Sequence, residues 1–218
     1  MKKAMLLLFS GFIVMMGMAQ TEKYVKAMQQ LVPAVDTTYS VEGLTSLANS
    51  FQRIADAEKN QWLPYYYAAL AHVNAAYMMS RGTMGMADKT DPLADKAEQL
   101  LSKAEALSGE NSEVYCVKKM IASLRLIGDP QNRYMTYGPM AEQALEKAKS
   151  LDPGNPRATL LEAQDKLFTP EQFGGSKTEA RRLLEEAIKK FEAFKPQSDL
   201  HPSWGLSSAK YFLVEAAK

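Results

Sequence analysis

Alanines recur seven residues apart in four segments of the chain, and this spacing restricts the fold more than any other feature. Seven residues make about two turns of an α-helix, so both alanines of a pair lie on one helical face. In the last three segments a leucine follows the first alanine by four residues, which adds a large side chain to the stripe. The sequence therefore predicts helices that pack in closely spaced pairs. The alanine pairs are Ala48 and Ala55, Ala97 and Ala104, Ala141 and Ala148, and Ala180 and Ala187; the leucines are Leu101, Leu145 and Leu184.

One segment, AEQALEKAKSLDPGNP (141–156), resembles the tetratricopeptide repeat family. Its small-large-small helix ends in Leu-Asp-Pro, and Asn-Pro opens the next helix. The first alanines of successive units are 49, 44 and 39 residues apart. Regular repeats span roughly 34 residues, so the extra residues are expected in loops within the units. The resemblance covers residues 41–195. It implies an all-α, TPR-like α-solenoid of the exported bacterial type with long loops inside its repeats, built from about four helical hairpins and a C-terminal capping helix.

Capping residues and prolines set the expected helix boundaries. Asp91-Pro92 and Asn155-Pro156 each place a capping residue before a proline at the first helical position. Turn formers then predict loops at 80–91, 128–133 and 169–177. No segment alternates well enough to be a strand. The expected helices span residues 21–33, 41–58, 62–80, 92–108, 112–127, 133–150, 156–168, 177–194 and 203–217.

The C-terminal part carries two further boundary signals. Ser176 with Glu179 forms a capping box for the eighth helix. The last helix follows a break at Pro202 and should cover the open end of the stack, as terminal repeats must. Trp204 and Phe212 are its expected core residues.

The first 19 residues have the features of a secretory signal peptide. Lys2 and Lys3 precede an apolar run over residues 4–16, and small residues stand before Gln20. The run is shorter than the roughly 20 residues that span a bilayer. We therefore expect cleavage after Ala19, a TPR-like helical-repeat domain over 20–218, a periplasmic or secreted location, and no stable membrane insertion after cleavage.

Charge and catalytic motifs exclude several classes of function. Without Lys2 and Lys3 the chain has 24 basic and 25 acidic residues, so nothing favours nucleic acid as a partner. Cys116 is the only cysteine, which excludes an internal disulfide and suits a core position. The only histidines are His72 and His201, and no HExxH, GxSxG or CxxC motif is present. We expect neither an enzyme nor a bound cofactor.

The predicted helix 62–80 is rich in aromatic and polar side chains. Consecutive residues point about 100° apart on a helix, so the three tyrosines at 65–67 are not expected to be buried together. In tetratricopeptide proteins the first helix of each unit lines a concave groove. The resemblance thus implies a scaffold that binds a peptide, a protein segment or another subunit. The candidate partner-binding residues are Tyr66, Tyr67, His72, Asn74 and Tyr77.

A second interpretation gives the chain a small ligand. The segments 173–175 and 202–205 are similar to paired loops in exported tetratricopeptide-like proteins, including partner subunits of TRAP-type transporters. This similarity implies a transport accessory protein with a pocket near Phe173 and Trp204. A purely structural interpretation stays open, because the two glycines after Phe173 can form a tight bend and Trp204 can pack in the core.

Two short motifs complete the list of candidates. Met78, Met79, Met84 and Met86 lie close in sequence to His72, and thioether sulfur suits Cu(I), but the repeated motif of methionine-type copper sites is absent, so no metal site is expected. Asp-Thr-Thr at 36–38 resembles the acceptor motif for O-glycosylation in the Bacteroidetes group. The motif would place Thr37 in a surface loop.

Overall fold

Every regular element that the structure describes is a helix, which confirms the all-α prediction. The computed structural model describes residues 22–81 and 83–218, so the predicted signal peptide lies outside the described part. None of the described helices is both long and apolar enough to cross a bilayer. The elements are α1 (Glu22–Leu31), the 3₁₀ helix η1 (Val32–Asp36), α2 (Val41–Glu58), α3 (Trp62–Ser80), α4 (Ala87–Ser108), α5 (Ser112–Gly128), α6 (Pro130–Leu151), α7 (Pro156–Phe168), the 3₁₀ helix η2 (Glu171–Phe173), α8 (Lys177–Ala193) and α9 (Leu206–Ala216).

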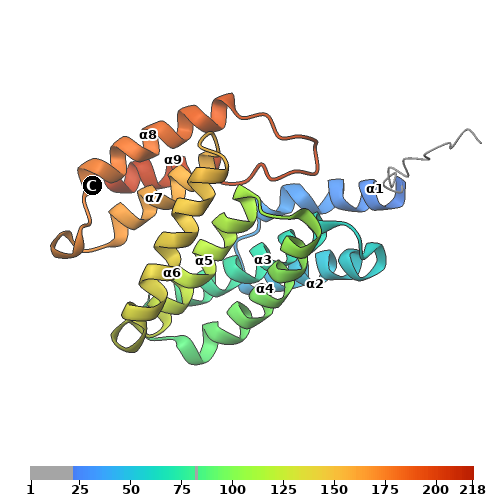
Figure 1. Ribbon diagram of the computed structural model, residues 1–218, viewed down its shortest axis with the longest axis horizontal. Helices are drawn as coiled ribbons and strands as arrows, with labels where there is room; N and C mark the ends of the chain where they lie inside the picture. The colour runs from blue at the N-terminus through green and yellow to red at the C-terminus, as the bar shows by residue number, and fades with distance from the viewer. Residues whose placement is uncertain (1–21, 82) are drawn as a thin grey trace, which may run out of the picture.

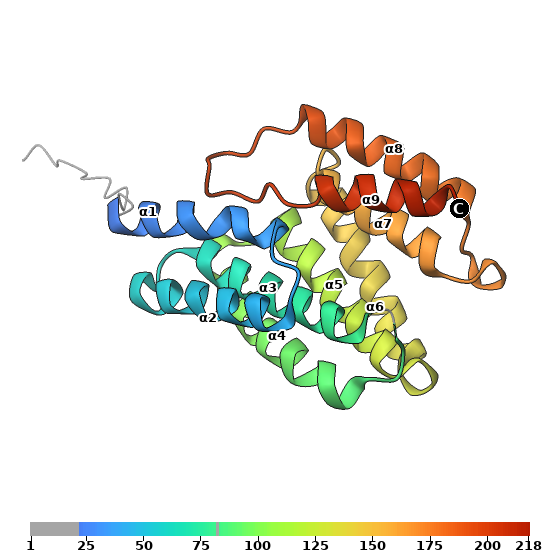
Figure 2. The ribbon, with the colours of Figure 1, turned by 180° about the vertical axis from the view of Figure 1, so that it is seen from behind.

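Helices that follow each other in the chain pack side by side (Figures 1 and 2). The main pairs are α2 with α3, α3 with α4, α5 with α6, and α7 with α8. The alanine and leucine stripes lie in these interfaces: Ala97, Leu101 and Ala104 of α4 are buried, as are the equivalent residues of α6 and α8. Because an alanine occupies little space, the partner helix can approach closely at these positions.

Two helices begin earlier than the sequence predicts. α4 starts at Ala87, with Pro92 inside the helix, so Asp91 is not a cap. Its carboxylate instead accepts two hydrogen bonds from the Arg133 guanidinium, at 2.8 and 2.6 Å. α6 starts at Pro130 inside the predicted loop 128–133, because the Asp129 side chain accepts from the backbone N–H of residue 132 and caps the helix.

The other predicted caps are present. The Asn155 side chain accepts from the Arg157 N–H at 2.9 Å, and the Ser176 hydroxyl accepts from the Glu179 N–H at 3.2 Å. The second half of the capping box is missing, since the Glu179 carboxylate binds the Arg182 guanidinium.

The C-terminal strap, residues 194–205, closes the array in a way that the resemblance does not imply. In a solenoid each unit contacts only its neighbours. Here the strap runs back to the first third of the chain (Figures 1 and 2), where the Gly205 N–H donates to the Asp36 carboxylate at 3.1 Å. α9 then packs on α8 and α7. Trp204 therefore belongs to the strap and not to the last helix. The structure does not confirm the TPR-like solenoid arrangement.

Replacing Ala148, which is fully buried in α6, tests the packing of the stripes. Ala148→Leu should lower the free energy of unfolding by about 1–3 kcal/mol, because extra methyl groups in a filled interface force neighbours apart. Urea denaturation measures the change. Gln143→Leu on the exposed face of α6 is the matched control and should have little effect. Equal stability of Ala148→Leu and the parent would contradict the observed packing.

Candidate functional site

The three consecutive tyrosines of α3 are all buried, so the expectation that one of them faces a groove is wrong. Tyr65 is 6% exposed, Tyr66 is 0% exposed and Tyr67 is 1% exposed. α3 packs against α2, α4 and α5, and the strap covers part of it. Most side chains of a helix surrounded in this way face other helices, which agrees with a sequence that is apolar on nearly all sides.

The tyrosine hydroxyl groups are bound inside the fold. The Tyr66 hydroxyl donates to the Glu113 carboxylate at 3.1 Å, and the Tyr67 hydroxyl donates to the Leu200 carbonyl in the strap at 2.9 Å. The hydroxyl of Tyr77, which is half-buried, donates to a backbone carbonyl of α5. These contacts hold α3, α5 and the strap together, so Tyr66 and Tyr67 stabilise the core and are not available to a partner.

His72 is also buried, and its environment keeps it neutral. Neither ring nitrogen has a hydrogen-bond partner in the described part of the chain. Burial, with a smaller effect from the Lys96 ammonium, lowers the pKa of His72 to about 4. Of the five predicted partner-binding residues, only Asn74 and Tyr77 are partly exposed.

The lowered pKa of His72 predicts a loss of stability in acid. The unfolded chain binds a proton on His72 near pH 6.5, whereas the folded chain binds it only near pH 4. Stability is therefore present above about pH 6.5 and falls as the pH drops towards 4. His72→Leu should remove this dependence, which is worth about 2 kcal/mol at pH 4.5. Urea denaturation of parent and variant at pH 7.5 and 4.5 measures it; an identical pH effect in both proteins would contradict the assignment.

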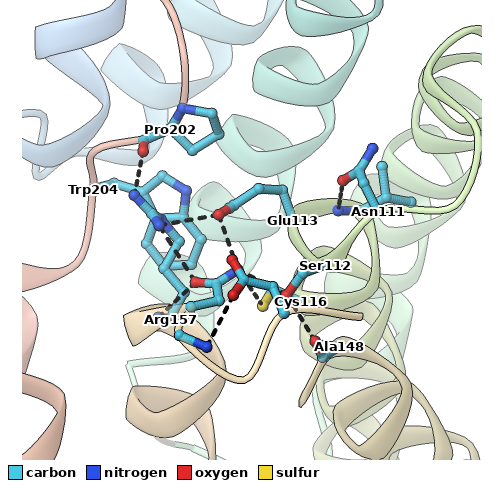
Figure 3. A network of polar contacts seen from close by, with 12 residues as sticks. Asn111, Ser112, Glu113, Cys116, Ala148, Arg157, Pro202 and Trp204 are labelled. Atoms are coloured by element: carbon cyan, nitrogen blue, oxygen red, sulfur yellow. Dashed lines mark hydrogen bonds and ion pairs between the residues drawn. The ribbon is translucent and has the colours of Figure 1, made fainter. Parts of the chain in front are cut away.

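A polar network lies at the junction of α5, α7 and the strap (Figure 3). Arg157, at the start of α7, is completely buried. Its guanidinium donates to the Glu113 carboxylate at 3.0 Å and to the Pro202 carbonyl in the strap. The Asn155 amide donates to Glu113 and to the Ser112 hydroxyl, both at 2.9 Å. The network thus joins three segments that are distant in sequence.

Burial also determines the chemistry of this network. It raises the pKa of Glu113, and the Arg157 cation opposes that shift. It raises the pKa of the neighbouring Cys116 thiol well above its usual range, so the thiol is not a reactive nucleophile. The network is therefore buried and holds the three segments together, and it is not an accessible reaction site.

Phe173 and Trp204, the two residues of the alternative pocket, do not meet. Trp204 packs near the start of α7, over the Arg157 guanidinium, and its Nε1–H donates to the Tyr66 hydroxyl at 2.8 Å. Phe173 follows the other end of α7 and is exposed. The 13 residues of α7, about 20 Å of helix, lie between these two positions. The cavity of about 40 Å³ beside Trp204 is far below the roughly 300 Å³ of a typical ligand pocket.

An exposed aromatic surface lies where the end of α7 meets α9, formed by Phe168, Tyr211, Phe212 and Val214. Phe168, Tyr211 and Val214 are each about 60% exposed, an unusual cluster for a water-facing surface. The Phe168 and Phe212 rings meet edge to face at 5.4 Å, and the Tyr211 and Phe212 rings at 5.3 Å. Phe212, which was expected in the core, is half-buried and packs against the apolar cluster of α7, α8 and α9. The sequence analysis did not identify the other three residues. The run of four apolar residues at 211–214 could have indicated them, because it covers more than one face of a helix.

A second exposed apolar surface, the α6 surface, lies on the first half of α6. Tyr134 and Met135 are 58% and 82% exposed, and Met140 is also exposed. Met84 is exposed in the loop between α3 and α4, and the Gly85 N–H holds this loop against the end of α5. Unlike those of the aromatic surface, the side chains of the α6 surface make no ring-to-ring contact within the described residues.

A groove of about 400 Å³ lies between α6, α7 and α8, and several charged side chains line it. Lys149 pairs with Glu162 at 3.1 Å, and Lys190 pairs with Glu186 at 3.0 Å. Ligand pockets are usually lined mainly by apolar side chains, whereas paired charges line this groove. The groove therefore suits an apolar ligand less well than the two exposed surfaces do.

The side chains that could bind a metal are dispersed over the described part of the fold. In residues 22–81 and 83–218 no three His, Cys, Asp or Glu side chains are placed to hold a metal ion. His72 and Cys116 are buried. The ring of His201 packs against Trp62 at 5.9 Å, and its Nδ1 lies 2.8 Å from the Ser198 hydroxyl.

Comparison with known proteins identifies a relative. No family model matches the chain, and no match was found among curated sequences. Among solved structures, the HusA haemophore from Porphyromonas gingivalis matches with 36% sequence identity and a TM-score of 0.76. The match covers 88% of this chain and 92% of the haemophore chain. The chain belongs to the HusA haemophore family.

This relationship corrects the sequence-based prediction of function. HusA is a haemophore, so its family favours a small ligand over the peptide or protein partner that we expected in a groove of α3. The burial of Tyr66, Tyr67 and His72 agrees with that correction. Membership of the tetratricopeptide repeat family is not confirmed; the helical hairpins that suggested it are also compatible with the HusA fold.

Proposed function

We propose that this protein binds haem and carries it outside the cytoplasm as a non-catalytic carrier. The observation that supports this most is the 36% identity to the HusA haemophore over 92% of the haemophore chain. In this proposal haem is the cargo and not a resident cofactor.

The aromatic surface is the candidate haem site. A porphyrin is a large, flat, apolar ring, and aromatic side chains bind such rings through stacked or edge-to-face contacts. Phe168 and Phe212 provide adjoining rings at the end of α7 and on α9. Phe173 lies five residues beyond Phe168 and is 66% exposed, so we include it as a further candidate for contact with haem. Trp204 is assigned to the core instead.

The burial of His72 and Cys116, and the packing of His201 against Trp62, support recognition through the macrocycle. A site built around an exposed histidine or thiolate would bind the iron first. Here these side chains are buried or packed against other groups, while phenylalanine rings are exposed. We therefore expect metal-free protoporphyrin to bind with an affinity similar to that of haem.

Phe168→Ala tests the proposed site. The variant should raise the Kd for haem and for protoporphyrin by up to about tenfold, because it removes one aromatic contact of about 1 kcal/mol. Titration followed in the Soret band measures both constants. Tyr134→Ala, equally exposed on the α6 surface, is the matched control and should bind like the parent. A parent protein that binds neither ligand would refute the proposed function, and weaker binding only in Tyr134→Ala would move the site to α6.

Export is a separate part of the proposal and has its own test. A haem carrier that works outside the cytoplasm needs a signal peptide, and residues 1–19 have the required pattern. The exported protein should begin at Gln20. Intact mass and N-terminal sequencing of exported material measure this directly; a product that retains residues 1–19 would contradict the cleavage site.

A further inference from the structure

A lysine borders the aromatic surface on α9. Lys210 lies one helical turn before Val214, and both side chains are exposed. Residues four apart on a helix are neighbours on one face, so the Lys210 side chain lies beside Val214. The apolar stem of a lysine covers apolar surface while its ammonium group stays in water. The aromatic surface therefore has a positively charged edge.

The ammonium group of Lys210 is available to a ligand, whereas the cations nearest to it along the chain and at the end of α7 are engaged. Lys218 binds Glu215, the only acidic residue of α9, at 2.6 Å. Lys166, near the end of α7, donates to the Gly174 carbonyl at 3.2 Å. Of these three lysines, Lys210 alone forms no ion pair or hydrogen bond through its side chain within residues 22–81 and 83–218.

We propose that Lys210 binds a carboxylate of the porphyrin, so that the site selects porphyrins whose carboxylates are free. The inference rests on the proposed function and deepens it by naming the polar part of the ligand that the protein recognises. Haem and protoporphyrin share a flat apolar ring with two propionate side chains on one edge. The ring lies on Phe168 and Phe212, and one propionate accepts a hydrogen bond from the Lys210 ammonium group, which has three donors. Because both ligands carry the same propionates, this contact also agrees with similar affinities for haem and protoporphyrin.

Solvent limits the strength of this contact. An ion pair between exposed groups contributes little to affinity, because water and salt screen the two charges. The aromatic contacts therefore supply most of the affinity, and Lys210 supplies a preference between ligands. The Debye length falls from about 10 Å at 0.1 M ionic strength to about 3 Å at 1 M, so the preference should weaken as salt is added.

Lys210→Met tests the contact, because it removes the charge and keeps a flexible apolar stem. The two ligands are protoporphyrin and its dimethyl ester, which has the same ring without the negative charges. At low salt the variant should raise the Kd for protoporphyrin by about two- to fivefold and leave the Kd for the ester unchanged. In about 1 M salt the difference for protoporphyrin should largely disappear. Titration followed in the Soret band, with both ligands in the same fraction of organic cosolvent, measures these constants.

Lys89→Met is the matched control, since Lys89 is an exposed lysine of α4, away from the aromatic surface. It should bind both ligands like the parent. If Lys210→Met weakens protoporphyrin and the ester equally, the stem and not the charge contacts the ring, and the inference is wrong. Parent-like binding of both ligands by Lys210→Met, or the same selective loss in Lys89→Met, also overturns it, although haem binding still holds. If the parent binds neither haem nor protoporphyrin, the proposed function itself fails.

Discussion

The guanidinium of Arg157 has no exposed surface, so its charge must be neutralised inside the fold. Glu113 supplies the opposite charge at 3.0 Å, and the Pro202 carbonyl supplies an acceptor from the strap. The faces of Phe194 and Trp204 lie 4.8 and 5.5 Å from the guanidinium carbon and add cation–π attraction. Removing one partner of such a buried pair typically costs about 3–5 kcal/mol. Because Arg157 also contacts Pro202, Phe194 and Trp204, these contacts favour one position of the strap.

That position determines where the aromatic surface forms. The strap ends at Gly205, which adopts a positive φ of 112° and donates its N–H to Asp36. α9 starts at the next residue, so its direction and rotation depend on this fixed point. The rotation buries Ala209 and Ala216 against α7 and α8 and leaves Tyr211 and Val214 in solvent. The exposed rings are thus a consequence of how the strap is held, although the strap itself touches no ligand in our proposal.

Local signals predicted the helices well, and contacts between distant segments account for what they missed. The caps Asn155 and Ser176 act over three residues or fewer, so the sequence contains all the information that they need. The burial of Tyr66 and Tyr67 depends on Trp204 and Leu200, more than 130 residues away, and no local pattern encodes that contact. The rule that three consecutive helical residues cannot all be buried holds for a helix with one solvent face. It fails for α3 because neighbours surround this helix.

The argument that consecutive apolar residues on a helix cannot all be buried was wrong for residues 65–67. For residues 211–214 the same argument would have correctly predicted exposed side chains. The difference lies in what surrounds each helix. α3 is central and has neighbours on every side, whereas α9 is the last helix and packs on α8 and α7 only. A terminal helix cannot bury four consecutive apolar side chains, so some of them must face water unless a ligand covers them. The haem that we propose as the ligand is a flat ring, and such a ring could cover these side chains. His72 and Cys116 are buried in the core, so this surface presents aromatic carbon to a ligand and neither an imidazole nor a thiolate.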